Sequence, residues 1–152
     1  MDTDIDRKDT PKRILIVEDE FLIALTAMSD LHAEGFEVVV KSDGRQGLLA
    51  ANSEHFDLII TDYIMPNMNG VDMIHAIRHS GERTPIVLTS SMSPSSLPQT
   101  ACGFNTFLPK PYRATDLCAL AHRFTSNVID HKLPSVYRPS ATKAGQIAQF
   151  AT

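Results

Sequence analysis

Five short apolar runs alternate along this chain with segments of helical spacing. The runs span residues 14–17, 37–40, 58–61, 86–89 and 106–108. Each run has the length of a strand, and strand–helix alternation favours a parallel sheet covered by helices on both faces. The chain has 152 residues, 43% of them hydrophobic, which suffices for one well-filled core. We therefore predict a single α/β domain with a parallel sheet, and we expect no second folded module.

Apolar residues at helical spacing follow most of the strands. They are Phe21, Ala24, Leu25, Met28 and Leu31 in the first helix, Val71, Ile74 and Ile77 in the third, and Leu117, Leu120, Ala121, Phe124 and Val128 in the last. We predict that each set forms the buried face of its helix. The second helix is short, from Asp43–Gly44 to about Asn52, and Gly35 ends the first helix in a left-handed conformation.

The segment after the fourth strand is rich in turn-forming residues. It reads Ser-Ser-Met-Ser-Pro-Ser-Ser-Leu-Pro over residues 90–98, and two prolines so close together break any helix that spans them. We therefore predict that the fourth helix is shortened to one or two turns near 98–102, with a mobile approach.

The ends of the chain differ from the central part. Residues 1–12 are polar and of mixed charge, unlike a secretory signal, and we expect a flexible N-terminus. The domain itself is expected over 13–128. Periodicity fades in 129–152, where prolines and small polar residues predict an irregular tail that is either disordered or docked on a partner or on its own domain.

Charge and cysteine usage narrow the classes of partner. Lysine and arginine number 14 against 18 acidic residues, a net charge of -4, with no long basic run, so we expect no nucleic-acid partner. No stretch approaches a transmembrane span, so we expect no membrane insertion and a cytoplasmic location. Cys102 and Cys118 lack metal-binding or CxxC spacing and are expected to be reduced residues of the core or of a helix face.

Charged residues stand where three of the predicted strands end. Asp62 follows the run 58–61, Glu18-Asp19 follows 14–17, and Lys110 lies just past 106–108. Because the carboxyl ends of parallel strands meet at one edge of a sheet, three carboxylates and one ammonium should converge there. Clustered carboxylates repel one another unless a cation neutralises them, and an all-oxygen donor set favours Mg²⁺.

Four motifs in this order resemble the receiver domain of two-component response regulators. They are Glu18-Asp19, the segment from Asp62 through Met65-Pro66 to Gly70, the hydroxyl-rich end of 86–90, and Lys110-Pro111 after Phe107. The resemblance runs from about residue 13 to about 124. It implies a flavodoxin-like (βα)5 doubly wound sheet with strand order 2-1-3-4-5.

The resemblance also implies roles for the clustered residues. Asp62 would accept a phosphoryl group from the phosphohistidine of a histidine kinase or histidine phosphotransfer protein. Asp19 would be the direct Mg²⁺ ligand and Glu18 a secondary one, with Asp62 and the backbone carbonyl of Ile64 completing the protein's share. Lys110 would neutralise phosphoryl charge, and its bond to Pro111 would be cis.

Further roles follow from the same resemblance. Counted from Pro85, the switch hydroxyl falls at Ser90, with Thr89 and Ser91 one residue to either side as alternatives. Phe107 stands where the family has a rotating aromatic, although simple core packing explains it equally well. Ile64 and Met92 flank the route of the attacking water, and because both are apolar we expect slow hydrolysis of the phosphoryl group.

We expect a stand-alone receiver that signals through a downstream protein target, passes its phosphoryl group onward, or drains a kinase as a phosphate sink. Such a protein is no turnover enzyme, since it catalyses only its own phosphorylation and dephosphorylation. It could be a monomer or a weak dimer. One alternative is a phosphorylation-independent binding module. Another is a haloacid dehalogenase-like phosphatase, but its motif needs a second acid where this chain has Ile64.

Overall fold

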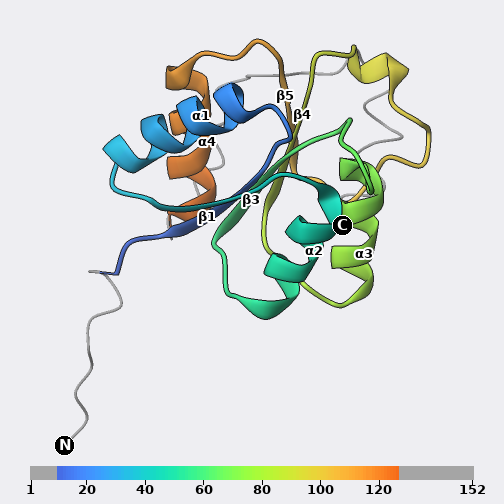
Figure 1. Ribbon diagram of the computed structural model, residues 1–152, viewed down its shortest axis with the longest axis horizontal. Helices are drawn as coiled ribbons and strands as arrows, with labels where there is room; N and C mark the ends of the chain where they lie inside the picture. Colours follow the sequence, from blue (N-terminus) through green and yellow to red (C-terminus); the bar gives the residue numbers. More distant parts are fainter. Residues whose placement is uncertain (1–9, 127–152) are drawn as a thin grey trace, which may run out of the picture.

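The computed structural model describes residues 10–126. Five parallel strands form one sheet in the order β2-β1-β3-β4-β5 (Figure 1). The strands are β1 (Arg13–Val17), β2 (Glu37–Lys41), β3 (Leu58–Asp62), β4 (Ile86–Ser90) and β5 (Thr106–Pro109). Each lies within one residue of its predicted limits. The predicted doubly wound parallel sheet and its strand order are therefore confirmed.

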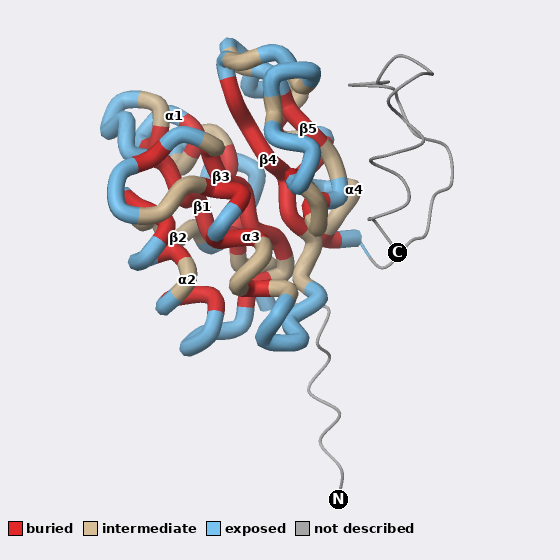
Figure 2. Tube along the Cα trace, turned by 90° about the vertical axis from the view of Figure 1, so that its right-hand side faces the viewer, coloured by how far each residue is buried: buried red, intermediate tan, exposed pale blue. Residues whose placement is uncertain are grey.

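Helices cover the two faces of this sheet in pairs, as Figure 1 shows. The helices are α1 (Phe21–Ala33) and α4 (Ala114–Thr125) on one face, and α2 (Gly44–Ser53) and α3 (Gly70–His79) on the other. Each pair encloses its own hydrophobic cluster. Strands β3 and β4 are buried along their whole length (Figure 2), which explains why both begin with three consecutive apolar residues.

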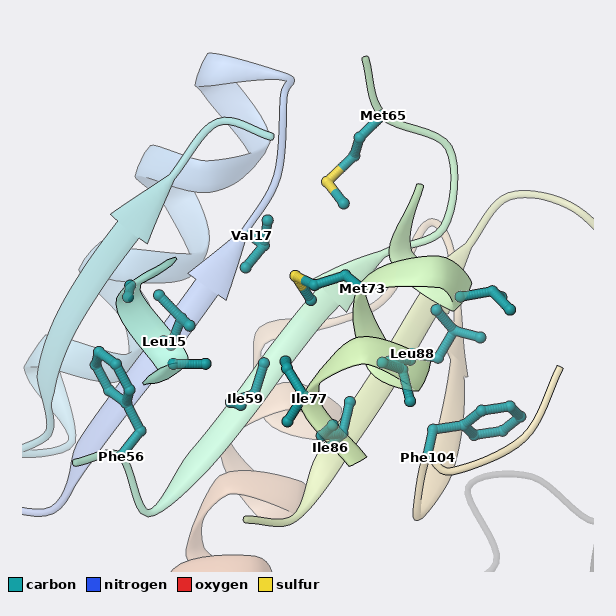
Figure 3. Packing of buried hydrophobic residues seen from close by; sticks show 14 of the residues in the cluster. Leu15, Val17, Phe56, Ile59, Met65, Met73, Ile77, Ile86, Leu88 and Phe104 are labelled. Atoms are coloured by element: carbon teal, nitrogen blue, oxygen red, sulfur yellow. The ribbon is translucent and has the colours of Figure 1, made fainter. Parts of the chain in front are cut away.

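The cluster under α2 and α3 shows how side chains join a helix to the sheet. Leu15, Ile59 and Leu88 of three adjacent strands lie in one cluster with Met73 and Ile77 of α3 (Figure 3). Burying such side chains stabilises the fold by about 1.5–3 kcal/mol each. The sheet is therefore a rigid support for the loops at its edge.

The segment between β4 and β5 differs in part from the prediction. Its helix is shortened, as expected, but the position near 98–102 is wrong. The helical turn is a 3-10 helix, η1 (Pro94–Ser96), whereas the Ala101 N–H donates to the Pro98 carbonyl in a single turn. Pro94 suits the first position of a helix, and Leu97 is extended because it precedes a proline. Because the fourth helix is reduced to this turn, the fifth helix predicted from sequence carries the label α4.

The buried face of α1 also differs from the prediction. Ala24 and Leu31 are buried as expected, together with Ala27, but Phe21 is 73% exposed and Leu25 is also exposed. Apolar residues occur nearly all round this helix, so helical spacing alone did not identify the face that packs. Gly35 follows the helix with φ of +93°, which confirms its left-handed conformation.

In α4 the predicted stripe is largely confirmed. Leu117, Leu120 and Ala121 are buried, and Phe124 packs against the same cluster from a half-buried position. Val128 and the predicted irregular tail lie outside the described residues, as does most of the predicted flexible N-terminus. None of the helices within 10–126 is long and apolar enough to cross a bilayer. The cytoplasmic location stays a prediction.

Candidate functional site

Four of the charged residues singled out in the sequence meet at one edge of the sheet. Asp62 is the last residue of β3, Glu18 and Asp19 follow β1, and Lys110 follows β5. All these strands are parallel, so their carboxyl ends open on the same side. Residues nearly a hundred positions apart in sequence are thereby brought into contact.

The three acids lie close together, and the amine forms ion pairs with two of them. One carboxylate oxygen from each of Glu18, Asp19 and Asp62 lies within 4.8 Å of the others. The Lys110 Nζ is 2.6 Å from Glu18 Oε2 and 3.2 Å from Asp62 Oδ2. Glu18 and Asp62 are only 4% and 8% exposed, whereas Asp19 is open to solvent. The site thus has a buried ionic base and an exposed mouth.

Backbone donors fix the orientation of the two buried carboxylates. The Tyr63 N–H donates to Asp62 Oδ1 at 2.8 Å, and the Glu20 N–H donates to Glu18 Oε1 at 3.2 Å. In each carboxylate the second oxygen faces Lys110. The carboxylates are therefore positioned before any ligand binds.

Burial and like charge make this arrangement electrostatically costly. Burial raises the pKa of Asp62, and the neighbouring Asp19 adds to that rise against the opposing effect of Lys110. Burial likewise raises the pKa of Glu18. Burial alone would lower the pKa of Lys110, but its contacts with Glu18 and Asp62 outweigh this and leave that pKa raised. A further positive charge at the three acids would relieve the remaining repulsion.

The donor set therefore suits a hard divalent cation. All three candidate ligand atoms are oxygens, and no nitrogen or sulfur ligand stands among them. Mg²⁺ takes one or two carboxylates and completes its octahedron with water and phosphate oxygens. Glu18, Asp19 and Asp62 could hold such an ion, and the contribution of the Ile64 carbonyl stays a prediction.

Gly70 holds the loop after Asp62 close to the end of β3. Its N–H donates to the Tyr63 carbonyl at 2.7 Å, and a Cβ added there would overlap the carbonyl oxygen of Asp62. Asn69 caps α3 by accepting from the Asp72 N–H at 2.8 Å. In the sequence Gly70 was only the last residue of the motif that begins at Asp62, and this close approach of two backbone segments became visible only in the fold.

The three neighbouring hydroxyls lie in different surroundings. Thr89 is buried, and its hydroxyl donates to the Thr61 carbonyl at 3.3 Å. Ser90 is only 2% exposed, accepts a hydrogen bond from the Met92 N–H at 3.0 Å, and lines the same cavity as Asp62 and Lys110. Ser91 is exposed at that cavity. The structure therefore brings Ser90 and Ser91 to the site.

The remaining predicted residues are also placed. Phe107 is buried in the core cluster beneath α3, and its rotation stays a prediction. The side chain of Ile64 is 58% exposed beside Asp62, and Met92 is half-buried. The Lys110–Pro111 peptide bond is cis, as predicted.

A cavity of about 780 Å³ extends from Asp62 along α1. Besides the charged residues, it is lined by Leu22, Thr26 and Tyr112. Leu22 is 74% exposed and stands with Phe21, Leu25 and Ile64 among the large exposed hydrophobic residues of the described chain. We call these four the apolar rim. Sequence reasoning missed the rim because it assigned Phe21 and Leu25 to the core.

Comparison with known proteins agrees with this geometry. A family model described as the response regulator receiver domain matches residues 14–122. The chain belongs to this receiver family. A high-resolution structure of the chemotaxis response regulator CheY4 of Vibrio cholerae is 30% identical to this receiver, covers 76% of it and 99% of the other chain, and gives a TM-score of 0.70.

A second solved structure bears on the acidic cluster. The receiver domain of the sensor histidine kinase PA1611 from Pseudomonas aeruginosa PAO1 is 26% identical, with a TM-score of 0.70 over 76% of this receiver and 98% of that chain. That protein was solved with a magnesium ion coordinated in its active-site cleft.

Curated relatives are longer than this receiver. The uncharacterized transcriptional regulatory protein YkoG of Bacillus subtilis strain 168 is 28% identical over 141 residues, which are 91% of this chain but 57% of YkoG. The chain spans about half the length of the curated relatives it matches. The expectation of a stand-alone receiver therefore stays a prediction, which the mass of the protein in its own cells would test.

Proposed function

We propose that this receiver accepts a phosphoryl group on Asp62 from the phosphohistidine of a histidine kinase or a histidine phosphotransfer protein. The observation that carries the proposal is the contact of Lys110 with both Glu18 and Asp62, which places a cation beside a fixed carboxylate that lines a cavity. The chain would be a stoichiometric acceptor that catalyses only its own phosphorylation and dephosphorylation.

The transfer asks little covalent work of the protein. An Asp62 carboxylate oxygen attacks phosphorus, the bond from phosphorus to the donor's imidazole nitrogen breaks, and the imidazole leaves with that electron pair. Lys110 stabilises the charge on the phosphoryl oxygens. Mg²⁺, when bound to the acidic cluster, supplies the further positive charge that this chemistry needs. The Tyr63 N–H keeps Asp62 oriented throughout.

Ser90 is the proposed switch hydroxyl. It lines the same cavity as Asp62 and accepts a hydrogen bond from the Met92 N–H. A new hydrogen bond from its hydroxyl to a phosphoryl oxygen would therefore pull the first residues of the β4–β5 connection toward the site. That movement would change the surface presented to a downstream protein target. Phe107 would follow Ser90 only if its buried ring repacks.

The acyl phosphate is expected to be long-lived. Ile64 and Met92 offer no polar side chain to orient an attacking water molecule. Replacing Ile64 with Asn, which can hold water, should speed dephosphorylation about tenfold, as followed by loss of label. An unchanged rate in that variant would contradict the assignment of Ile64.

The apolar rim is the proposed landing surface for the phosphohistidine-bearing protein. A donor must bring its imidazole within bonding reach of Asp62, which is 8% exposed, so the donor necessarily covers the surface around the cavity. Exposed Leu22 and Ile64 line that cavity. Burying these apolar side chains against a partner would remove them from water and so contribute to the free energy of association.

Phosphotransfer with two kinds of donor tests this proposal. The Leu22→Ser variant should accept phosphate from a labelled kinase or phosphotransfer protein about tenfold more slowly, while its reaction with acetyl phosphate is unchanged. Leu49→Ser is the matched control, because Leu49 is 68% exposed on α2 at the opposite face. Equal slowing with both donors, or equal slowing in both variants, would contradict the rim assignment. Multiple turnover of a donor would contradict the acceptor role.

A further inference from the structure

A second cavity, of about 850 Å³, lies between the end of α3 and the segment that leads into β5. Its lining includes His75, Arg78 and His79 of α3 together with Cys102 and Phe104. In Figure 1 the connection from β4 to β5 passes beside α3 at this point. The cavity shares no lining residue with the cavity at the acidic site and is therefore separate from it.

Cys102 and His75 are already in contact in this cavity. The Cys102 Sγ is 3.5 Å from His75 Nε2, which is also 2.9 Å from the Thr100 carbonyl oxygen. Zinc binds imidazole nitrogen at about 2.0–2.1 Å and thiolate sulfur at about 2.3 Å, so two tetrahedral ligands of these kinds stand about 3.5 Å apart. The sulfur and nitrogen are thus spaced as a shared metal ion requires.

His79 offers a third ligand one helical turn further along α3. Histidines at i and i+4 lie on the same face of a helix, a spacing used by zinc sites. Within residues 10–126, only the Glu18, Asp19 and Asp62 group has three ligand atoms within 4.8 Å, so His79 must rotate to complete the set. Its side chain is exposed and lines the same cavity, which leaves it room to turn.

We propose that His75, His79 and Cys102 bind a borderline-soft divalent cation such as Zn²⁺. The Cys102 thiol loses its proton to solvent, and the His75 Nε2 exchanges its contact with the Thr100 carbonyl for the metal. The ring proton of His75 then resides on Nδ1. Three protein ligands leave the fourth position to water. Nitrogen and sulfur donors distinguish this site from the all-oxygen acidic cluster.

Such a metal would link two segments that are now joined by side-chain contacts such as those of His75 and Arg78. His75 and His79 belong to α3, whereas Cys102 belongs to the connection that begins directly after Ser90. The bound cation would therefore restrain the segment that the proposed switch moves. The site would let metal availability oppose or tune the response to phosphorylation.

The other cysteine provides a natural comparison. Cys118 has a histidine four residues on, His122, but the His122 Nε2 is bound to Glu34 Oε2 at 2.8 Å. The Cys118 Sγ is 3.9 Å from the Asp30 carbonyl oxygen, and burial, with Glu34 and Asp30, raises the pKa of its thiol. Cys118 and His122 are therefore near each other in sequence, but the imidazole is held by a carboxylate, whereas His75 contacts the sulfur of Cys102.

Titration of the reduced full chain with Co²⁺, a coloured substitute for Zn²⁺, tests the site. The wild type and Cys118→Ser should develop a thiolate-to-cobalt charge-transfer band and strong visible absorption of tetrahedral cobalt, both removed by added Zn²⁺. Cys102→Ser should show neither, and His79→Ala should bind at least about tenfold more weakly. Circular dichroism checks that each variant is folded.

Each other result counts against the site. Bands that survive in Cys102→Ser but vanish in Cys118→Ser would transfer the metal to α4 and overturn the proposal. Absence of a thiolate band in every folded protein would also overturn it. An unchanged affinity in His79→Ala would remove the third ligand on which the proposal depends.

Discussion

The loops that follow β3 and β4 begin at neighbouring strand ends but are held in different ways. After β3 the chain returns directly to a helix, secured by backbone bonds such as Gly70 N–H to the Tyr63 carbonyl. After β4 it runs for 15 residues, 91–105, with one 3-10 turn. That segment is attached to α3 largely by side chains, with His75 bound to the Thr100 carbonyl and Arg78 to the Gly103 carbonyl.

This difference suggests a division of roles. Asp62 lies on the side where backbone packing leaves little freedom, which suits a group that must be pre-positioned for phosphoryl transfer. Ser90 lies at the start of the side-chain-tethered segment, which suits a part that changes its position. Long side-chain tethers can be released without breaking the sheet.

The largest expected effect is on the β3 side. Gly70→Ala should destabilise the protein by about 3 kcal/mol, because the added methyl group overlaps the Asp62 carbonyl oxygen and the backbone must shift. Urea unfolding measures this loss. Gly81→Ala is the control, since Gly81, in the loop after α3, has open space around it, and the substitution should cost only about 1 kcal/mol for its φ of +89°. Equal losses would mean that the loop after β3 is not rigid.

Removing the side-chain contacts that hold the β4–β5 connection should have a smaller effect on stability. Arg78 donates from Nε to the Gly103 carbonyl at 2.8 Å and from Nη2 to Asn105 Oδ1 at 3.3 Å. Arg78→Met should lower the free energy of unfolding by about 2 kcal/mol and speed hydrogen exchange of amides in 98–105. Arg83 is exposed and lines the cavity between α3 and the segment before β5. Arg83→Met should therefore change neither the free energy of unfolding nor the hydrogen exchange. Unaltered exchange in Arg78→Met would show that this segment is held by other contacts.

Asp62→Asn should stabilise the metal-free protein by about 1 kcal/mol at pH 7. Burial raises the pKa of Asp62, so ionisation of this carboxyl group opposes folding. The free energy of unfolding therefore falls as the pH rises through the pKa that Asp62 has in the folded protein. The substitution removes that loss. Its benefit should disappear below the ordinary aspartate pKa of about 3.9, where Asp62 is protonated in both states.

With Mg²⁺ bound, the wild type should be more stable than Asp62→Asn. At a concentration about 100 times its Kd, a bound ion adds about 2.7 kcal/mol to the wild type, and Asp62→Asn should gain less because a ligand is missing. Thermal unfolding with and without Mg²⁺ measures both effects. A metal-free Asp62→Asn protein that is less stable at pH 7 would show that the contact with Lys110 outweighs burial.

The smallest effect is expected at η1. The Ser93 Oγ accepts from the Ser95 N–H at 3.3 Å, and Ser93→Ala should cost about 0.5 kcal/mol because the turn is short and exposed. Asn69→Ala removes the cap of α3 on the β3 side and should cost about twice as much. If the two costs are equal, the contrast between the loops does not extend to their caps.

Part of the fold and of the candidate site could be predicted from the sequence. The sheet edge followed from Asp62, Glu18-Asp19 and Lys110, because parallel strands fix where their ends meet. The break in the fourth helix followed from Pro94 and Pro98, but the position of the remaining turn depended on local backbone geometry.

Contacts that depend on tertiary packing were missed. The α1 face was misassigned because Phe21 and Leu25 belong to a helix that is apolar on nearly every side. The contact between Cys102 and His75 joins residues 27 positions apart across a connection without periodicity. No local pattern could have predicted that pair.

The central claim is that the carboxylate of Asp62 is activated by its assembled surroundings. The most direct measurement is incorporation of label from radioactive acetyl phosphate into the full chain, with and without Mg²⁺. One phosphoryl group per chain should be incorporated in the presence of Mg²⁺, little without it, and none in Asp62→Asn. Equal labelling of Asp62→Asn, or labelling that does not depend on Mg²⁺, would contradict the account.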